Sequence, residues 1–180
     1  MSVRMVEIFN RRDIKAPEIT NHIDVSYNDM EKACEHLAAR IMEKEGKPGL
    51  IVYIQRGGMV PGRMLSDMLE VSNMTAVAAR RYTGVGKAME EPEIGYIDLT
   101  GSPGYILVVD DVADHGTTLK RVKERLEETS NEKVVLCTLY VKPQSVEKVK
   151  IDYSDGEAAN ETWIIFQYEK NETMRLLGRK

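Results

Sequence analysis

The chain has 180 residues, 42% hydrophobic and 30% charged, a mix typical of one globular domain that buries a core without disulfides or a structural metal. Its net charge of −4 argues against a nucleic-acid-binding protein, which usually presents a basic face, but allows small phosphate-bearing substrates. No apolar run approaches membrane-spanning length and the first residues lack a signal peptide's apolar core, so we expect a cytoplasmic protein with no membrane partner.

The first part of the chain predicts an arm, two helices and a strand between them. Residues 1–24 are polar and weakly periodic, and we interpret them as an N-terminal arm that belongs to a small hood. Asn28 and Glu31 resemble a capping box, and the apolar residues that follow recur at spacings of three and four, as on one face of a helix. Leu50–Ile54 predicts a buried strand, and Pro61 can start the second helix.

The second part predicts three more strands with a loop and a helix among them. Met74–Ala79, Tyr105–Val109 and Val134–Val141 are apolar runs suited to strands, and Trp163–Phe166 is a last apolar run. Residues 80–94 are rich in Gly, Lys and Glu without an apolar period, which predicts a long loop of the kind that is often functional. The helix before the third of these strands has an inner face of Leu119, Val122 and Leu126.

These elements indicate an α/β fold. Strands that alternate with helices and form continuous apolar runs are typical of a mostly parallel sheet covered by helices on both faces. We place the main domain at residues 25–170 and a polar C-terminal tail at 171–180, and interpret Tyr153–Gly156 as only a turn. Cys34 and Cys137 lie in apolar stretches without metal-site spacing, so we expect both to be buried and reduced.

The segment after Val109 carries the clearest chemistry. Asp110 and Asp111 follow a buried strand, at the edge of an open α/β sheet where ligands bind, and two adjacent carboxylates there need partners such as sugar hydroxyls. Gly116, Thr117 and Thr118 then open a helix, whose free N–H groups and hydroxyls form a cradle for phosphate. Together they describe a ribose 5-phosphate site.

Other interpretations of these residues remain open. A strand-terminal acidic pair also binds Mg²⁺ in receiver domains, and a Gly-Thr helix start is also an ordinary N-terminal cap. A Walker A loop is excluded because no GxxxxGK[ST] pattern is present. The residues alone therefore leave a ribose phosphate and another anion as alternatives.

The segment 105–119 resembles the signature of phosphoribosyltransferases, in which an apolar strand, two acids and two small or apolar residues precede a turn rich in Gly and Thr. Three further segments resemble that family in the expected order: 51–62 with Arg56-Gly57-Gly58, 139–143 with Lys142-Pro143, and 161–164 with Trp163-Ile164. The similarity extends from about residue 25 to 169 and is closest to the xanthine–guanine and hypoxanthine, or 6-oxopurine, branch. It implies a type I phosphoribosyltransferase-like, Rossmann-like fold.

The resemblance implies a site for phosphoribosyl pyrophosphate (PRPP). Asp110 and Asp111 would hold the ribose hydroxyls directly or through Mg²⁺, and Glu169 would be a third metal ligand. Arg56 and the Gly57 amide would bind pyrophosphate, with a cis peptide at Gln55-Arg56. The 5′-phosphate would be bound by the turn that comprises Asp114, His115, Gly116, Thr117 and Thr118.

The resemblance also implies a purine site. Asp114 would face N7 of the base as general acid or base, and Lys142 would donate to its O6. Trp163 would stack on the ring, and the Ile164 backbone would face position 2. The expected enzyme is a Mg²⁺-dependent pentosyltransferase of purine salvage that joins hypoxanthine, guanine or xanthine to PRPP.

The chain departs from the family pattern at three points. The usual turn has Thr-Gly-Gly-Thr, whereas His115 here replaces a hydroxyl-bearing residue and Thr117 replaces a glycine, which restricts the turn if that position needs positive φ. Relatives often have Pro-Trp where this chain has Gln167-Tyr168. These departures motivate an alternative, a nucleotide-sensing or RNA-binding regulatory protein with weak catalysis, and a third possibility is another nitrogenous base. Relatives commonly form homodimers or homotetramers, so the resemblance implies an oligomer.

Overall fold

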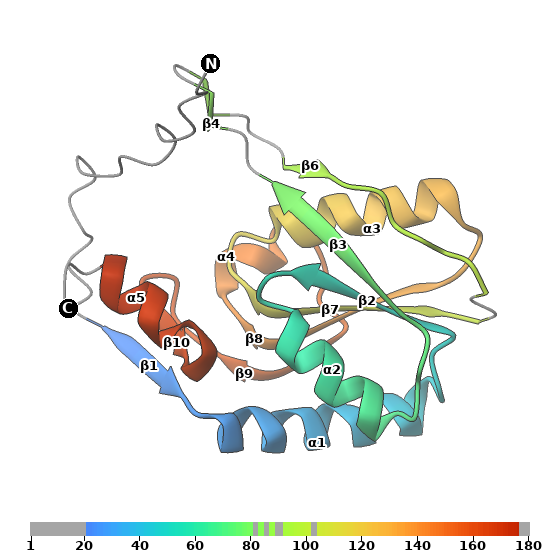
Figure 1. The fold of residues 1–180 in the computed structure, drawn as a ribbon, viewed down its shortest axis with the longest axis horizontal. Helices are drawn as coiled ribbons and strands as arrows, with labels where there is room; N and C mark the ends of the chain where they lie inside the picture. The colour runs from blue at the N-terminus through green and yellow to red at the C-terminus, as the bar shows by residue number, and fades with distance from the viewer. Residues whose placement is uncertain (1–20, 81–82, 85–86, 89–91, 102–103, 177–180) are drawn as a thin grey trace, which may run out of the picture.

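A six-stranded sheet forms the centre of the molecule (Figure 1). The computed structural model describes residues 21–80, 83–84, 87–88, 92–101 and 104–176. The strands lie in the order β6-β3-β2-β7-β8-β9 and are parallel except for the β3–β6 pair. Their bounds are β2 Leu50–Gln55, β3 Met74–Arg80, β6 Glu93–Ile94, β7 Ile106–Ala113, β8 Val134–Val141 and β9 Tyr153–Glu157.

Helices cover both faces of this sheet, as the sequence predicts. Successive side chains of a strand point to opposite faces, so Leu107 packs in the apolar layer beneath α1 (Tyr27–Lys44) and α2 (Met59–Met68). Its neighbour Val108 packs in the other layer, beneath α3 (Thr117–Thr129) (Figure 1). The predicted inner face of α3, Leu119, Val122 and Leu126, is buried. The predicted α/β class is confirmed.

The first helix begins earlier than the capping pattern predicts. Ser26, not Asn28, is its N-cap: the Ser26 hydroxyl accepts from the Asp29 amide at 3.2 Å, and the Asp29 carboxylate accepts from the Ser26 amide at 3.0 Å. Either residue can cap a helix, and the apolar stripe that begins at Met30 does not distinguish between them. The second helix likewise begins at Met59, two residues before Pro61.

Segments from near both ends of the chain form a second, two-stranded sheet. Strand β1 (His22–Val25) pairs in parallel with β10 (Trp163–Phe166), which is followed by a 3₁₀ turn at Gln167–Glu169 and by α5 (Lys170–Leu176). Figure 1 shows β1 and α5 beside the central sheet. We name this two-stranded sheet with α5 the hood: β10 lies within the segment placed in the main domain, and the segment expected to be a tail begins within a helix. Most of the predicted arm, residues 1–20, lies outside the described residues.

Two segments differ from their prediction. The turn expected at Tyr153–Gly156 is wrong: β9 lies there and pairs with β8, because an edge strand can be held by backbone hydrogen bonds with only Tyr153 buried. The predicted loop 80–94 contains β6 and the short pair β4 (Thr83–Gly84) and β5 (Lys87–Ala88), while its residues 81–82, 85–86 and 89–91 lie outside the described part.

Cys34 and Cys137 are both free and buried in one apolar layer, as expected. Within the described ranges, no helix combines the length and the apolar character needed to span a bilayer.

Candidate active site

The carboxyl ends of the parallel strands bring the predicted site residues to one edge of the sheet. Arg56 follows β2, Asp114 follows β7 and Lys142 follows β8. The peptide between Gln55 and Arg56 is cis, as the resemblance implies. The hood adds Trp163 from β10 to the same region. This is the edge at which open α/β sheets bind ligands.

The turn between β7 and α3 presents a helix N-terminus. Gly116 is the N-cap, with φ of 72° in the left-handed region, and no side chain caps the first N–H groups of α3. Thr117 is the first helical residue and does not have a positive φ. Replacement of the family's glycine by threonine therefore does not strain the turn. Uncapped N–H groups with two threonine hydroxyls beside them suit an anion such as phosphate.

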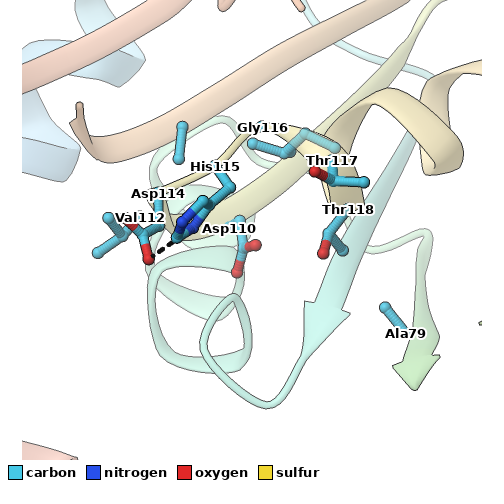
Figure 2. A pocket seen from close by; sticks show the side chains of 10 residues that line it. Ala79, Asp110, Val112, Asp114, His115, Gly116, Thr117 and Thr118 are labelled. Atoms are coloured by element: carbon cyan, nitrogen blue, oxygen red, sulfur yellow. Dashed lines mark ion pairs between the residues drawn. The ribbon is translucent and has the colours of Figure 1, made fainter. Parts of the chain in front are cut away.

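This turn forms one wall of a cavity of about 340 Å³ (Figure 2). The predicted sugar and phosphate residues other than Asp111 surround it. They are Asp110, Asp114, His115, Gly116, Thr117 and Thr118. We name this the phosphate-side cavity.

A second cavity of about 260 Å³ adjoins the first and contains the predicted base residues. Lys142, Trp163 and Ile164 line it together with Glu169 and Asp111, and we name it the base-side cavity. Trp163 is 41% exposed, which suits a stacking surface better than a core residue. Val112 and Asp114 line both cavities, so Asp114 stands where the two meet.

The two neighbouring aspartates lie in different cavities. The sequence predicts that they follow the strand, but β7 continues to Ala113, and Asp110 still pairs with Thr138 of β8. Adjacent strand residues point to opposite faces, so Asp110 lines the phosphate-side cavity and Asp111 the base-side cavity. Burial and the nearby Asp111 carboxylate raise the pKa of Asp110 well above its usual range.

Asp111 is held by contacts that the sequence does not indicate. Its Oδ1 accepts from the Val112 amide at 2.7 Å, and its Oδ2 accepts from the Tyr168 hydroxyl at 2.7 Å. The Tyr168 ring stacks on Phe166 with centroids 5.3 Å apart. A Cβ at Gly57 would overlap the Asp111 carboxylate, so a larger residue there would displace that side chain. Burial raises the pKa of Asp111, although these hydrogen bonds oppose the shift.

Arg56 contacts the C-terminal helix. Its Nη2 lies 2.6 Å from Oε2 of Glu172 on α5. The Arg56 side chain is 75% exposed, so this ion pair contributes little to stability and leaves the guanidinium available to another anion.

Asp114 is surrounded by donors. Its Oδ1 lies 3.0 Å from Lys142 Nζ and accepts from Gln144 Nε2 at 2.9 Å, and its Oδ2 lies 3.1 Å from His115 Nδ1 (Figure 2). Burial opposes ionisation, but the Lys142 hydrogen bond and charge, with smaller contributions from His115 and Gln144, lower the pKa of Asp114. His115 therefore faces the carboxylate beside it, a contact that its predicted phosphate role does not include.

Glu169 is the third carboxylate at the site, after Asp110 and Asp111, whose pKa is raised. Burial, with the charges of Asp111 and Glu172, raises the pKa of Glu169 to about 7. In the described part of the chain, no three His, Cys, Asp or Glu side chains are close enough together to hold a metal ion on their own. The predicted set of Asp110, Asp111 and Glu169 therefore does not form a cage made by the protein alone.

Three residues at the site have no role predicted from the sequence: Gln144, Tyr168 and Glu172. Of these, only Tyr168 stands out in the sequence, because it departs from the family pattern. The fold and the side chains at this edge define an α/β protein whose site suits a phosphorylated ligand beside a flat polar ring.

The sequence profile of the phosphoribosyl transferase domain matches residues 26–170, and the chain belongs to this family. The xanthine-guanine phosphoribosyltransferase of Idiomarina loihiensis is 31% identical over 145 residues, which are 81% of this chain and 85% of that protein. The enzyme of the same name from Gluconobacter oxydans is 29% identical over 156 residues, 86% of this chain and 89% of that protein. The structure of Helicobacter pylori xanthine-guanine-hypoxanthine phosphoribosyltransferase is similar with a TM-score of 0.74 at 26% identity, covering 86% of this chain and 99% of that one.

Proposed function

We propose that this phosphoribosyltransferase converts a 6-oxopurine and PRPP into a nucleoside 5′-monophosphate and pyrophosphate in purine salvage. The observation that carries the proposal is the pair of adjoining cavities with Asp114 between them, one beside a phosphate-binding turn and the other beside a lysine and an exposed tryptophan. The relatives named above act on xanthine and guanine by name, and they are transferases. A regulatory RNA-binding or nucleotide-sensing role is therefore not favoured.

PRPP occupies the phosphate-side cavity in this proposal. The 5′-phosphate accepts from the N–H groups at the start of α3 and from the Thr118 hydroxyl, and Asp110 accepts from the ribose hydroxyls. The pyrophosphate extends toward Arg56 and the Gly57 amide, where the guanidinium offsets its charge. Glu172, which is paired with Arg56, gives way to it.

The base occupies the base-side cavity. Lys142 donates to O6, Trp163 stacks on the ring, and the Ile164 backbone faces position 2. Adenine has an amine at position 6 in place of the oxygen, so Lys142 would face it donor to donor.

The reaction forms the bond from N9 of the base to C1′ of the ribose as the bond from C1′ to the pyrophosphate oxygen breaks. A free 6-oxopurine carries an imidazole proton that the N9-linked product lacks, and Asp114 accepts it at N7 as general base. Placing the base against C1′ and balancing the charge of the leaving group supply the remaining acceleration, so no protein nucleophile is needed.

Mg²⁺ fits this site as an ion that arrives with the substrate. Mg²⁺ usually keeps several waters and binds one or two carboxylates together with substrate phosphates, which agrees with the dispersed acids Asp110, Asp111 and Glu169. We assign them as its candidate ligands, because they line the two adjoining cavities and Mg²⁺ prefers oxygen ligands such as carboxylates. When bound, the ion offsets charge on the pyrophosphate. The cytoplasmic location and the dimer or tetramer stay predictions.

A panel of bases tests the proposed function directly. Purified protein with PRPP and Mg²⁺ is expected to release pyrophosphate with hypoxanthine, guanine or xanthine, and to use adenine at least about a hundredfold less well, because a site built to donate to O6 leaves buried groups unpaired with adenine. Equal turnover of adenine and hypoxanthine would overturn the assignment of specificity. Absence of pyrophosphate release with every base, together with a shifted RNA band at moderate salt, would instead favour the regulatory role.

Replacing Lys142 by methionine tests the contact with O6. KM for hypoxanthine is expected to rise roughly tenfold to a hundredfold, since one hydrogen bond from a charged donor is lost, while KM for PRPP changes little. Lys142→Arg keeps the charge and serves as the control for folding. An unchanged purine KM in Lys142→Met would remove Lys142 from base recognition.

A further inference from the structure

The short helix α4 (Pro143–Val146) connects the parts of the site. It begins directly after Lys142, and an added Cβ at Gly116 would lie 2.6 Å from the Ser145 carbonyl oxygen, so the helix packs against the phosphate turn. Lys148, just beyond it, donates from Nζ to Thr117 Oγ1 at 3.2 Å. Ser145 is fully buried, and its hydroxyl donates to the Lys142 carbonyl at 2.7 Å. These contacts hold α4 in a defined position beside Asp114.

Gln144, on this helix, closes a ring of polar contacts around Asp114. Its side-chain Nε2 donates to Asp114 Oδ1 at 2.9 Å, and its backbone N–H donates to Asn160 Oδ1 at 3.1 Å. The Asn160 carbonyl accepts from Lys142 Nζ at 3.3 Å, and the same Nζ lies 3.0 Å from Asp114 Oδ1. Two donors therefore share one oxygen of the carboxylate, and one of them, Gln144, is neutral.

Lys142 and Gln144 differ in how they contact Asp114 once a base is bound, and this step rests on the proposed function. Lys142 is the group assigned to O6, and its ammonium turns part of its donor capacity to the base. Gln144 has no role toward the base, and its side chain does not line the base-side cavity. The contact from Gln144 to Oδ1 is thus the one that remains while Asp114 receives the proton.

We propose that Gln144 is a positioning residue that holds the Asp114 carboxylate by Oδ1, so that Oδ2 is directed to the imidazole proton of the base. His115 Nδ1 lies 3.1 Å from Oδ2, and its 52% exposed side chain can move aside when the base enters. Among the described residues, the other charged groups that face Asp114 are Lys142, Asp111 and Glu169 in the base-side cavity and Asp110 in the phosphate-side cavity. A neutral donor fixes the carboxylate without adding to this set of charges.

Two replacements of nearly equal size test the proposal. Gln144→Met keeps the side-chain length and removes the donor, and kcat is expected to fall roughly tenfold, as for one hydrogen bond to a charged group, with KM for hypoxanthine within about twofold of wild type. Gln144→Glu places a second carboxylate against Asp114, and kcat is expected to fall further. The pKa of Asp114, followed by NMR of its carboxyl carbon and assigned with Asp114→Asn, is expected to rise in Gln144→Met and more in Gln144→Glu.

Val146→Ala, at a 56% exposed position of the same helix, is the matched control and is expected to leave kcat and the pKa of Asp114 unchanged. Turnover within about twofold of wild type in both Gln144 variants would overturn the proposal, as would a rise in purine KM alone. If Gln144→Met does not fold, Gln144→Glu still decides. If Asp114→Asn retains full turnover, the acid–base role in the proposed function fails, whereas the titration still reports whether Gln144 holds the carboxylate.

Discussion

Replacing Asp114 by asparagine is expected to lower kcat about a hundredfold, the usual contribution of a general acid–base residue. Asparagine has nearly the same shape, and its amide oxygen can accept from Lys142 and Gln144 as Oδ1 does. The fold and the cavities therefore persist while the proton acceptor is lost. Single-turnover measurements with hypoxanthine separate this loss in the chemical step from changes in binding or product release.

The pH dependence of stability tests separately whether the contacts around Asp114 keep its carboxylate ionised in the folded protein. Its pKa is lowered in the folded protein, so its ionised form stabilises the fold above the unfolded pKa of 3.8, and this contribution is lost as the pH falls through the lower folded pKa. Asp114→Asn removes that dependence, and its denaturant midpoint is expected to decline less than that of the wild type between about pH 5 and pH 3.

Wild-type turnover in Asp114→Asn would exclude Asp114 as the acid–base residue.

Segments of contiguous apolar residues could be located from the sequence because burial on both faces leaves a continuous signal. Strand β8 of the central sheet has the predicted bounds Val134–Val141, and the predictions for β2 and β3 end one residue early. The edge strand β9 was missed because it contains Asp155 and Gly156 and is held by backbone pairing with β8. Backbone pairing at a sheet edge leaves little trace in the pattern of side chains.

The same distinction applies to the site. The turn from Asp114 to Thr118 is contiguous in sequence, so its chemistry could be inferred locally. Gln144 reaches Asp114 across 30 positions and Glu172 reaches Arg56 across 116, and neither separation corresponds to a helical or strand repeat. Asp110 and Asp111 point into different cavities because β7 continues past Val109, where Asp110, Val112 and Ala113 still pair with β8. The acidic residues interrupt the apolar run, so the sequence does not indicate this continuation of the strand.

Replacing Gly116 by alanine is expected to destabilise the protein by about 3 kcal/mol and to raise KM for PRPP on the order of tenfold. Two costs combine at this position. The left-handed conformation at φ of 72° disfavours any residue with a Cβ, and the new methyl group would lie 2.6 Å from the Ser145 carbonyl oxygen on α4. Relief of that overlap moves the turn away from α4, and the N–H groups assigned to the 5′-phosphate move with it.

Gly46→Ala separates these two costs. Gly46 has φ of 73°, nearly the same as Gly116, but no atom lies within 4 Å of its added Cβ. This control is expected to lower Tm by only about 2–4 °C with KM for PRPP unchanged, against roughly 6–12 °C for Gly116→Ala. If both variants lose the same stability and bind PRPP equally well, the contact between the turn and α4 does not shape the phosphate site. A larger loss in Gly116→Ala, accompanied by weaker PRPP binding, would mean that α4 supports the phosphate turn as well as the carboxylate of Asp114.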